Sequence, residues 1–79
     1  MFKKIPKYFY LGKAWIVAKE GGYCETTLAI DSGEIIKWEN EVFGRNAEEV
    51  IIEYYELLGG KMVYQGKEVI TKEIWSERK

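Results

Sequence analysis

The strongest secondary-structure pattern in the chain lies in the stretch Asn46-Ala47-Glu48-Glu49-Val50-Ile51-Ile52-Glu53-Tyr54-Tyr55-Glu56-Leu57-Leu58-Gly59-Gly60. Asn46 is a residue type that caps helices, and Glu49 follows three positions later, as the partner in a capping box does. Gly59 can take the left-handed conformation that closes a helix, and Gly60 continues the break. The stretch therefore predicts a helix, and we expect the rest of the chain to form a sheet packed against it.

At about 100° per residue, this expected helix has one apolar and one acidic face. The apolar face contains Ala47, Val50, Ile51, Tyr54, Leu57 and Leu58, with Tyr55 at its margin. The acidic face contains Glu48, Glu49, Glu53 and Glu56, with Ile52 in its middle. We interpret Ile52, flanked by Tyr55 and the four glutamates, as the centre of a contact patch for a basic partner protein. The alternatives are an isolated surface isoleucine, which is common in proteins, and a face covered by a second layer of structure.

The remaining segments predict strands. Residues 8–19 and 23–30 are rich in aromatic and β-branched residues or alternate in polarity, and Gly21-Gly22 between them is typical of a hairpin. Residues 34–43 are expected to form a third strand after a turn at 31–33, and residues 61–64 a fourth. The segment 67–75 is expected to be the last strand, although its spacing also suits a short helix. The predicted fold class is α+β, an antiparallel sheet in the order β-β-β-α-β-β with a single helix packed on one face.

A single helix covers only one side of such a sheet, so the far side is expected to be either solvated or used for binding. The expected outward residues on that side are Tyr23, Glu25, Thr27, Lys37 and Glu39. We expect residues 1–79 to form one small domain, with residues 1–7 as an irregular arm because Pro6 cannot donate to a strand ladder.

The composition limits the classes of function. The chain is 47% hydrophobic and 15% aromatic, more aromatic surface than one small core needs, so a partner or a second copy is expected to cover some of it. A net charge of -1 gives no bulk attraction for nucleic acid. A single cysteine, Cys24, and no histidine favour a reducing, cytoplasmic location without a zinc site. No apolar run approaches the roughly 18 residues of a membrane span.

No residue pattern in the sequence indicates an enzyme. Cys24 has no histidine to act as its base, and no pair of carboxylates stands out from the many acidic residues. Neither glycine pair has the spacing of a phosphate-binding loop. We therefore expect no catalytic residue, no metal site and no cofactor.

The N-terminal segment offers an alternative function. It interleaves basic side chains with aromatic rings on which bases could stack, as single-strand nucleic-acid binders do. The residues concerned are Lys3, Lys4, Lys7, Tyr8, Tyr10 and Lys13. A strand that buries one or two of these rings while its lysines protect a sheet edge would produce the same pattern.

The expected function is a small non-enzymatic protein-binding module, an inhibitor or adaptor, that acts through the acidic helix face or through a sheet edge. Its origin could be a virus or another mobile element, or equally a cell. Single-stranded nucleic-acid binding by the N-terminal segment is the second hypothesis, and a structural homodimer is the third.

Overall fold

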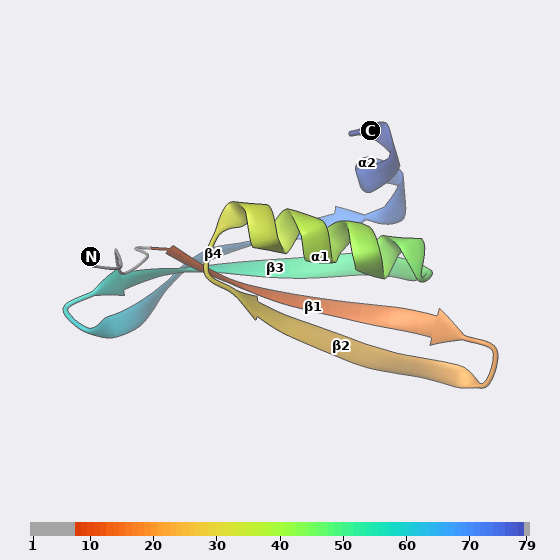
Figure 1. The fold of residues 1–79 in the computed structure, drawn as a ribbon, viewed down its shortest axis with the longest axis horizontal. Helices are drawn as coiled ribbons and strands as arrows, with labels where there is room; N and C mark the ends of the chain where they lie inside the picture. Colours follow the sequence, from red (N-terminus) through yellow and green to blue (C-terminus); the bar gives the residue numbers. More distant parts are fainter. Residues whose placement is uncertain (1–7, 79) are drawn as a thin grey trace, which may run out of the picture.

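The computed structural model describes residues 8–78, which form four strands and two helices (Figure 1). In chain order these are β1 (Tyr8–Ala18), β2 (Gly21–Ala29), α1 (Ser32–Gly44), β3 (Ala47–Leu58), β4 (Lys61–Thr71) and α2 (Lys72–Glu77). The strands form one antiparallel sheet in the order β2-β1-β3-β4. The predicted class, an α+β domain with a helix on one face of an antiparallel sheet, is confirmed.

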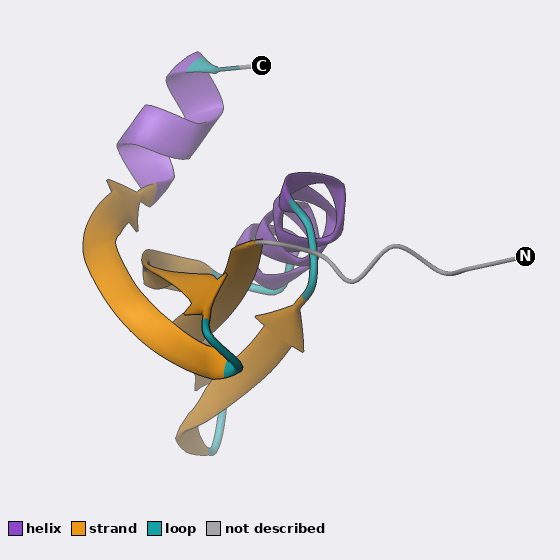
Figure 2. Ribbon diagram, turned by 90° about the vertical axis from the view of Figure 1, so that its left-hand side faces the viewer, coloured by secondary structure: helices purple, strands orange, loops and turns teal. Residues whose placement is uncertain are grey.

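Both helices in the described part of the chain lie on the same face of the sheet (Figure 2). Strands β2 and β3 both pair antiparallel with β1, so α1 connects two strands of the same direction across the one between them. Helix α1 contacts β1, β2 and β3, and Figure 2 shows both helices on the same side of the twisted sheet. Within residues 8–78, no helix and no second sheet covers the other side of the sheet.

The helix predicted over residues 46–60 is wrong, because most of this stretch forms the central strand β3. Its β-branched and aromatic residues, with Val50, Ile51 and Ile52 in succession, favour a strand, and pairing with β1 and β4 on both sides decides the outcome. Asn46 does not begin a helix. It follows the end of α1 with a left-handed φ of 72°, and its N–H donates to the carbonyl oxygen of Phe43. Gly59 and Gly60 form the two-residue turn to β4, both with the positive φ that such hairpins use.

The strand predicted over residues 34–43 is also wrong, because this segment lies in helix α1. Helix α1 begins after its N-cap residue, Asp31, far upstream of the start expected at Asn46. The Asp31 carboxylate accepts from the Glu34 N–H at 2.7 Å, and the Glu34 carboxylate accepts from the Ile30 N–H at 3.0 Å. The element order is accordingly β-β-α-β-β-α rather than β-β-β-α-β-β.

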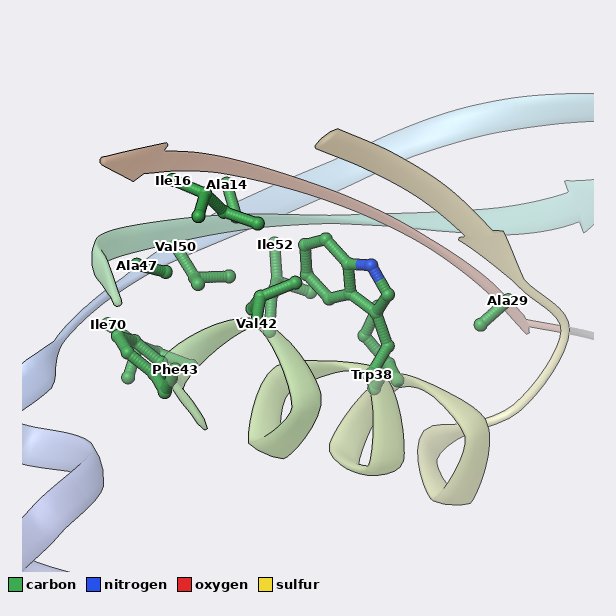
Figure 3. Close-up of a cluster of buried hydrophobic side chains, with 11 residues drawn as sticks. Ala14, Ile16, Ala29, Trp38, Val42, Phe43, Ala47, Val50, Ile52 and Ile70 are labelled. Atoms are coloured by element: carbon green, nitrogen blue, oxygen red, sulfur yellow. The ribbon is translucent and has the colours of Figure 1, made fainter. Parts of the chain in front are cut away.

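The core lies between α1 and the sheet (Figure 3). From α1 it receives Ile35, Trp38, Val42 and Phe43, which recur at the spacing of one helical face. The sheet supplies smaller side chains: Ala14, Ile16, Ala29, Ala47, Val50, Ile52 and Ile70. Figure 3 shows the Trp38 indole standing between the helix and the sheet. The small residues of the sheet leave the space that this large ring fills.

Gly12 lies in the regular part of β1, where the strand packs against α1. The irregularity in the pairing of β1 with β3 lies between Ala14 and Ile16. The Trp38 ring lies directly against the Gly12 backbone, where an added Cβ would come within 3.0 Å of three ring carbons. Glycine in β1 therefore serves close packing of the helix on the sheet.

The C-terminal segment differs from the expected final strand over residues 67–75. Strand β4 runs without interruption from Lys61 to Thr71, and helix α2 follows, capped by the Thr71 hydroxyl, which accepts from the Ile74 N–H. The short-helix alternative for this segment is thus correct for its second half. Trp75 of α2 stacks on Phe43 of α1, with ring centroids 5.1 Å apart, and this contact holds α2 against the main helix.

Candidate protein-binding face

The helix-free surface of the sheet, here called the open face, is formed by alternate residues of all four strands. Side chains opposite one another in the pairing register share a face, and the neighbours of buried residues point away from the core. The open face consists of Phe9, Leu11, Lys13, Trp15, Val17, Cys24, Thr26, Leu28, Ile51, Glu53, Tyr55, Leu57, Met62, Tyr64, Lys67 and Val69. Most of these side chains are apolar.

Six large apolar side chains of the open face are each at least 40% exposed. They are Trp15 (53%), Val17 (45%), Leu28 (60%), Met62 (45%), Tyr64 (50%) and Val69 (43%). Large apolar side chains that gather on one exposed surface of a protein commonly mark a binding site. The patch spans the sheet from the β2 edge to the β4 edge.

Aromatic rings mark the two ends of the open face. At one end the Trp15 indole lies over Gly22 of the neighbouring strand, so closely that a Cβ there would stand 2.5 Å from the ring. At the other end Tyr55 and Tyr64 meet edge to face, with centroids 5.7 Å apart. Both contacts fix exposed rings in defined positions, which lowers the entropy lost when a partner immobilises them.

The charged side chains of the open face are compensated locally. Lys13 Nζ lies 2.9 Å from Glu53 Oε1, and this hydrogen-bonded carboxylate raises the pKa of Lys13. Lys67 is directly opposite Glu53 in the register. Glu53 thus stands between two lysines, and the centre of the face carries little net charge.

The structure separates the residues predicted to form an acidic helix face. Ile52, the expected centre, is only 3% exposed and belongs to the core. Glu53 and Tyr55 lie on the open face, whereas Glu56 points to the helix side, because successive residues of a strand alternate. Glu48 and Glu49 are exposed near the start of β3, at the irregular pairing with β1. No single helical surface joins these six residues, so the expected geometry of the patch is wrong.

The residues of the predicted nucleic-acid segment are also divided. Lys3, Lys4 and Lys7 lie outside the described residues. Tyr10 is on the helix side and packs edge to face on Tyr54, and Tyr8 follows the same side of β1. Among the described residues of this segment, only Lys13 lies on the open face, where it forms an ion pair with Glu53.

The outward residues expected on the far side of the sheet are likewise misplaced. Glu25 and Thr27 lie on the helix side, and Arg45 at the end of α1 donates to Glu25 at 2.8 Å and to the Tyr23 hydroxyl at 3.3 Å. This contact with Arg45 lowers the pKa of Glu25. Lys37 and Glu39 belong to α1 and not to the sheet.

A concave region lies between α1, the sheet and α2. One cleft of about 270 Å³ is lined by Ile36, Glu39, Asn40, Trp75 and Arg78, and Glu39 and Arg78 also line an adjacent one of about 240 Å³. Arg78 reaches Glu68 at 2.8 Å and Glu39 at 3.9 Å. Tyr54 donates to Glu68 at 2.5 Å, and burial together with this bond raises the pKa of Tyr54 to about 12. The hydrogen bonds from Tyr54 and Arg78 in turn lower the pKa of Glu68. This network ties α2 to the sheet.

Glu39 is the one buried charged residue in the described part of the chain, at 5% exposure. Burial raises the pKa of its carboxyl group, and Arg78 only partly opposes this effect. Because the pKa of Glu39 is raised in the fold, this residue costs no stability below its ordinary pKa. The cost grows as the pH rises from the ordinary pKa to the folded pKa, and it is constant above the folded pKa. We therefore expect Glu39→Gln to stabilise the protein at neutral pH and to have little effect under acidic conditions.

Chemical denaturation of both proteins, below and above the ordinary carboxyl pKa of about 4.3, measures this difference. Loss of stability in Glu39→Gln at neutral pH would mean that attraction to Arg78 outweighs the cost of burial.

Sequence reasoning missed the open face because its residues become neighbours only through strand pairing. Trp15 and Leu28 lie on the predicted hairpin. The sequence does not indicate that Met62, Tyr64 and Val69 of β4 share a sheet face with them. One pattern in the sequence does point to the open face. Trp15 and Val17 alternate with Ala14 and Ile16, so both faces of this strand are apolar and only one of them can face the core.

Within residues 8–78, no group of three or more cysteine, aspartate or glutamate side chains is arranged to hold a metal ion. Neither described helix has the length and apolar character that a membrane crossing requires. No family model matches the chain, and no curated protein or solved structure matches it either.

Proposed function

We propose that this chain is a small non-enzymatic protein-binding module, an inhibitor or adaptor, whose contact surface is the open face of its sheet. The observation that carries the proposal is the group of six large apolar side chains, each at least 40% exposed, on one helix-free surface. Removing such a surface from water supplies the main driving force for protein association.

The anatomy of the open face supports a protein partner. Its exposed rings, Trp15 and Tyr64, are residue types that dominate binding energy in protein interfaces, and Met62 adds an adaptable apolar contact. Its charged residues are few: Lys13 pairs with Glu53, and Lys67 lies opposite Glu53 in the register. A partner that covers this face need not supply groups for unpaired charges.

Single-stranded nucleic acid remains the second candidate, favoured by the exposed Trp15 and Tyr64 rings on which bases could stack. Such binders combine stacking with a positive groove for the phosphates. On the open face, however, Glu53 compensates Lys13 and lies opposite Lys67, which leaves little positive charge for a backbone. A protein partner is therefore favoured over single-stranded nucleic acid. We also propose a cytoplasmic location, which the free and exposed Cys24 supports.

The test is affinity capture from nuclease-treated lysate with the native chain and three variants. Trp15→Ala and Tyr64→Ala each remove an exposed ring of the open face, and Ile36→Ala removes an apolar side chain of equal exposure (55%) from α1 on the opposite side. We expect each ring substitution to weaken binding of a captured protein by about tenfold or more, and Ile36→Ala to leave it unchanged.

The dissociation constants are measured by calorimetry with the purified captured protein. Circular dichroism and thermal unfolding of each variant confirm that the fold is retained. Capture that disappears with nuclease would transfer the function to nucleic acid, and equal binding by all three variants would exclude the open face as the contact surface.

A further inference from the structure

The two edges of the sheet differ in how they are protected against pairing with another strand. At the β4 edge the register with β3 shifts at Gln65, and Gly66 next to it has a φ of 145°. Exposed lysines, Lys61 and Lys67, stand on either side of this irregularity. Bulges and lysines are the devices by which natural sheets prevent edge-to-edge association.

The β2 edge has none of these devices. Its nine residues, Gly21–Ala29, contain no lysine and no proline. They pair with β1 one to one from Ala18↔Gly21 to Tyr10↔Ala29, without the register shift found in each of the other two strand pairs. Within residues 8–78 this strand pairs with β1 only. Its outer backbone groups therefore present a regular template for one more antiparallel strand.

We propose that β2 pairs with β2 of a second copy of this chain, antiparallel and centred on Thr26, to give a continuous eight-stranded sheet. A twofold axis perpendicular to the sheet relates the two copies, as antiparallel pairing of identical edges requires. The main helices then lie on the same side of the joined sheet, and the two open faces become one surface. The inference stands on the edge alone and does not depend on the proposed function.

The side chains of β2 favour a second copy as the occupant and Thr26 as the centre. In this register Thr26 lies opposite Thr26 of the second copy, Cys24 opposite Leu28, and Glu25 opposite Thr27. Threonine pairs across strands are favourable, and no like charges meet. A register centred on Glu25, the middle residue of the strand, would instead place two glutamates opposite each other. Glu25 already has its partner in Arg45, 2.8 Å away, so the edge carries no uncompensated charge into the pairing.

Cysteine cross-linking tests both the pairing and its register. In Cys24→Ser/Thr26→Cys the only thiols of the two copies lie directly opposite each other, at a Cβ separation close to that of a disulfide. The matched control, Cys24→Ser/Val69→Cys, carries its thiol on the same face at the opposite edge. We expect mild oxidation to convert the Thr26→Cys protein to a disulfide-linked dimer and to leave the control largely monomeric.

Sedimentation equilibrium over a range of concentrations measures the same association without a cross-link. The native chain should approach twice its monomer mass of 9.3 kDa, and Thr26→Lys, which sets two lysines opposite each other, should raise the dimer dissociation constant at least about tenfold. A native chain that stays at 9.3 kDa at the highest concentration overturns the inference. So does equal cross-linking of the control, or a Thr26→Lys protein that dimerises as the native chain does. Sedimentation tests the dimer and affinity capture tests the open face, so a failure of one proposal does not affect the other.

Discussion

Replacing Gly12 by valine is expected to destabilise the fold by about 3 kcal/mol or more, one of the largest effects of any single substitution in this chain. The Trp38 ring lies against the Gly12 backbone, and three of its carbons would stand within 3.0 Å of a new Cβ. Trp38 is 7% exposed and packs between α1 and the sheet, so the ring can make room for a new side chain only by giving up part of its packing in the core. A loss of this size is a large fraction of the stability of a 79-residue domain.

Denaturant unfolding of Gly12→Val against the native chain measures the loss. The matched control is Gly44→Ala, because a Cβ at Gly44 meets no atom within 4 Å and its φ is not positive. This control should be neutral or more stable by up to about 1 kcal/mol. In the double variant Gly12→Val/Trp38→Leu, the smaller leucine side chain leaves room for valine. The double variant should therefore lose less free energy of unfolding than the sum of the losses of the two single variants. Additive effects would show that the Gly12–Trp38 contact is not the cause.

Ile35→Ala is expected to lower the free energy of unfolding by about 2–5 kcal/mol, whereas Ile36→Ala should lower it by less than about 0.5 kcal/mol. Ile35 is 4% exposed in the core, and Ile36 is 55% exposed on the outer side of α1. If residues 34–43 were a strand with Ile36 inward, the two effects would be reversed. Thermal unfolding of Ile35→Ala and Ile36→Ala therefore tests the helix directly, with each variant serving as the control for the other.

The first half of the fold was predictable from local signals. Alternating polarity and Gly21-Gly22 correctly predict the β1–β2 hairpin, since a two-strand hairpin needs only neighbouring residues. The helix and the strand that follow were exchanged because both carry capping-box spacings. Asp31 with Glu34 is the real capping box, and Asn46 with Glu49 is the false one. Pairing of β3 with two neighbours decides between them, and no local pattern contains that information.

The candidate site was less predictable than the fold. Of the expected protein-binding residues, Glu53 and Tyr55 lie on the open face. They lie in strand β3, however, and not in the helix expected from the sequence. Chain order did not indicate that β1 lies between β2 and β3, and this order determines which side chains gather on the uncovered side. The exposed rings could be anticipated only as an excess of aromatic residues over the needs of one small core.

The most direct test of the proposed binding surface is hydroxyl-radical footprinting of the chain, alone and with its captured protein partner. Oxidation of each side chain is followed by mass spectrometry. We predict strong protection of Trp15, Met62 and Tyr64, which lie at both ends of the open face, and unchanged oxidation of Ile36 on α1. Protection of Ile36, with the three open-face residues as reactive as in the free chain, would contradict this prediction and move the contact surface to the helical side.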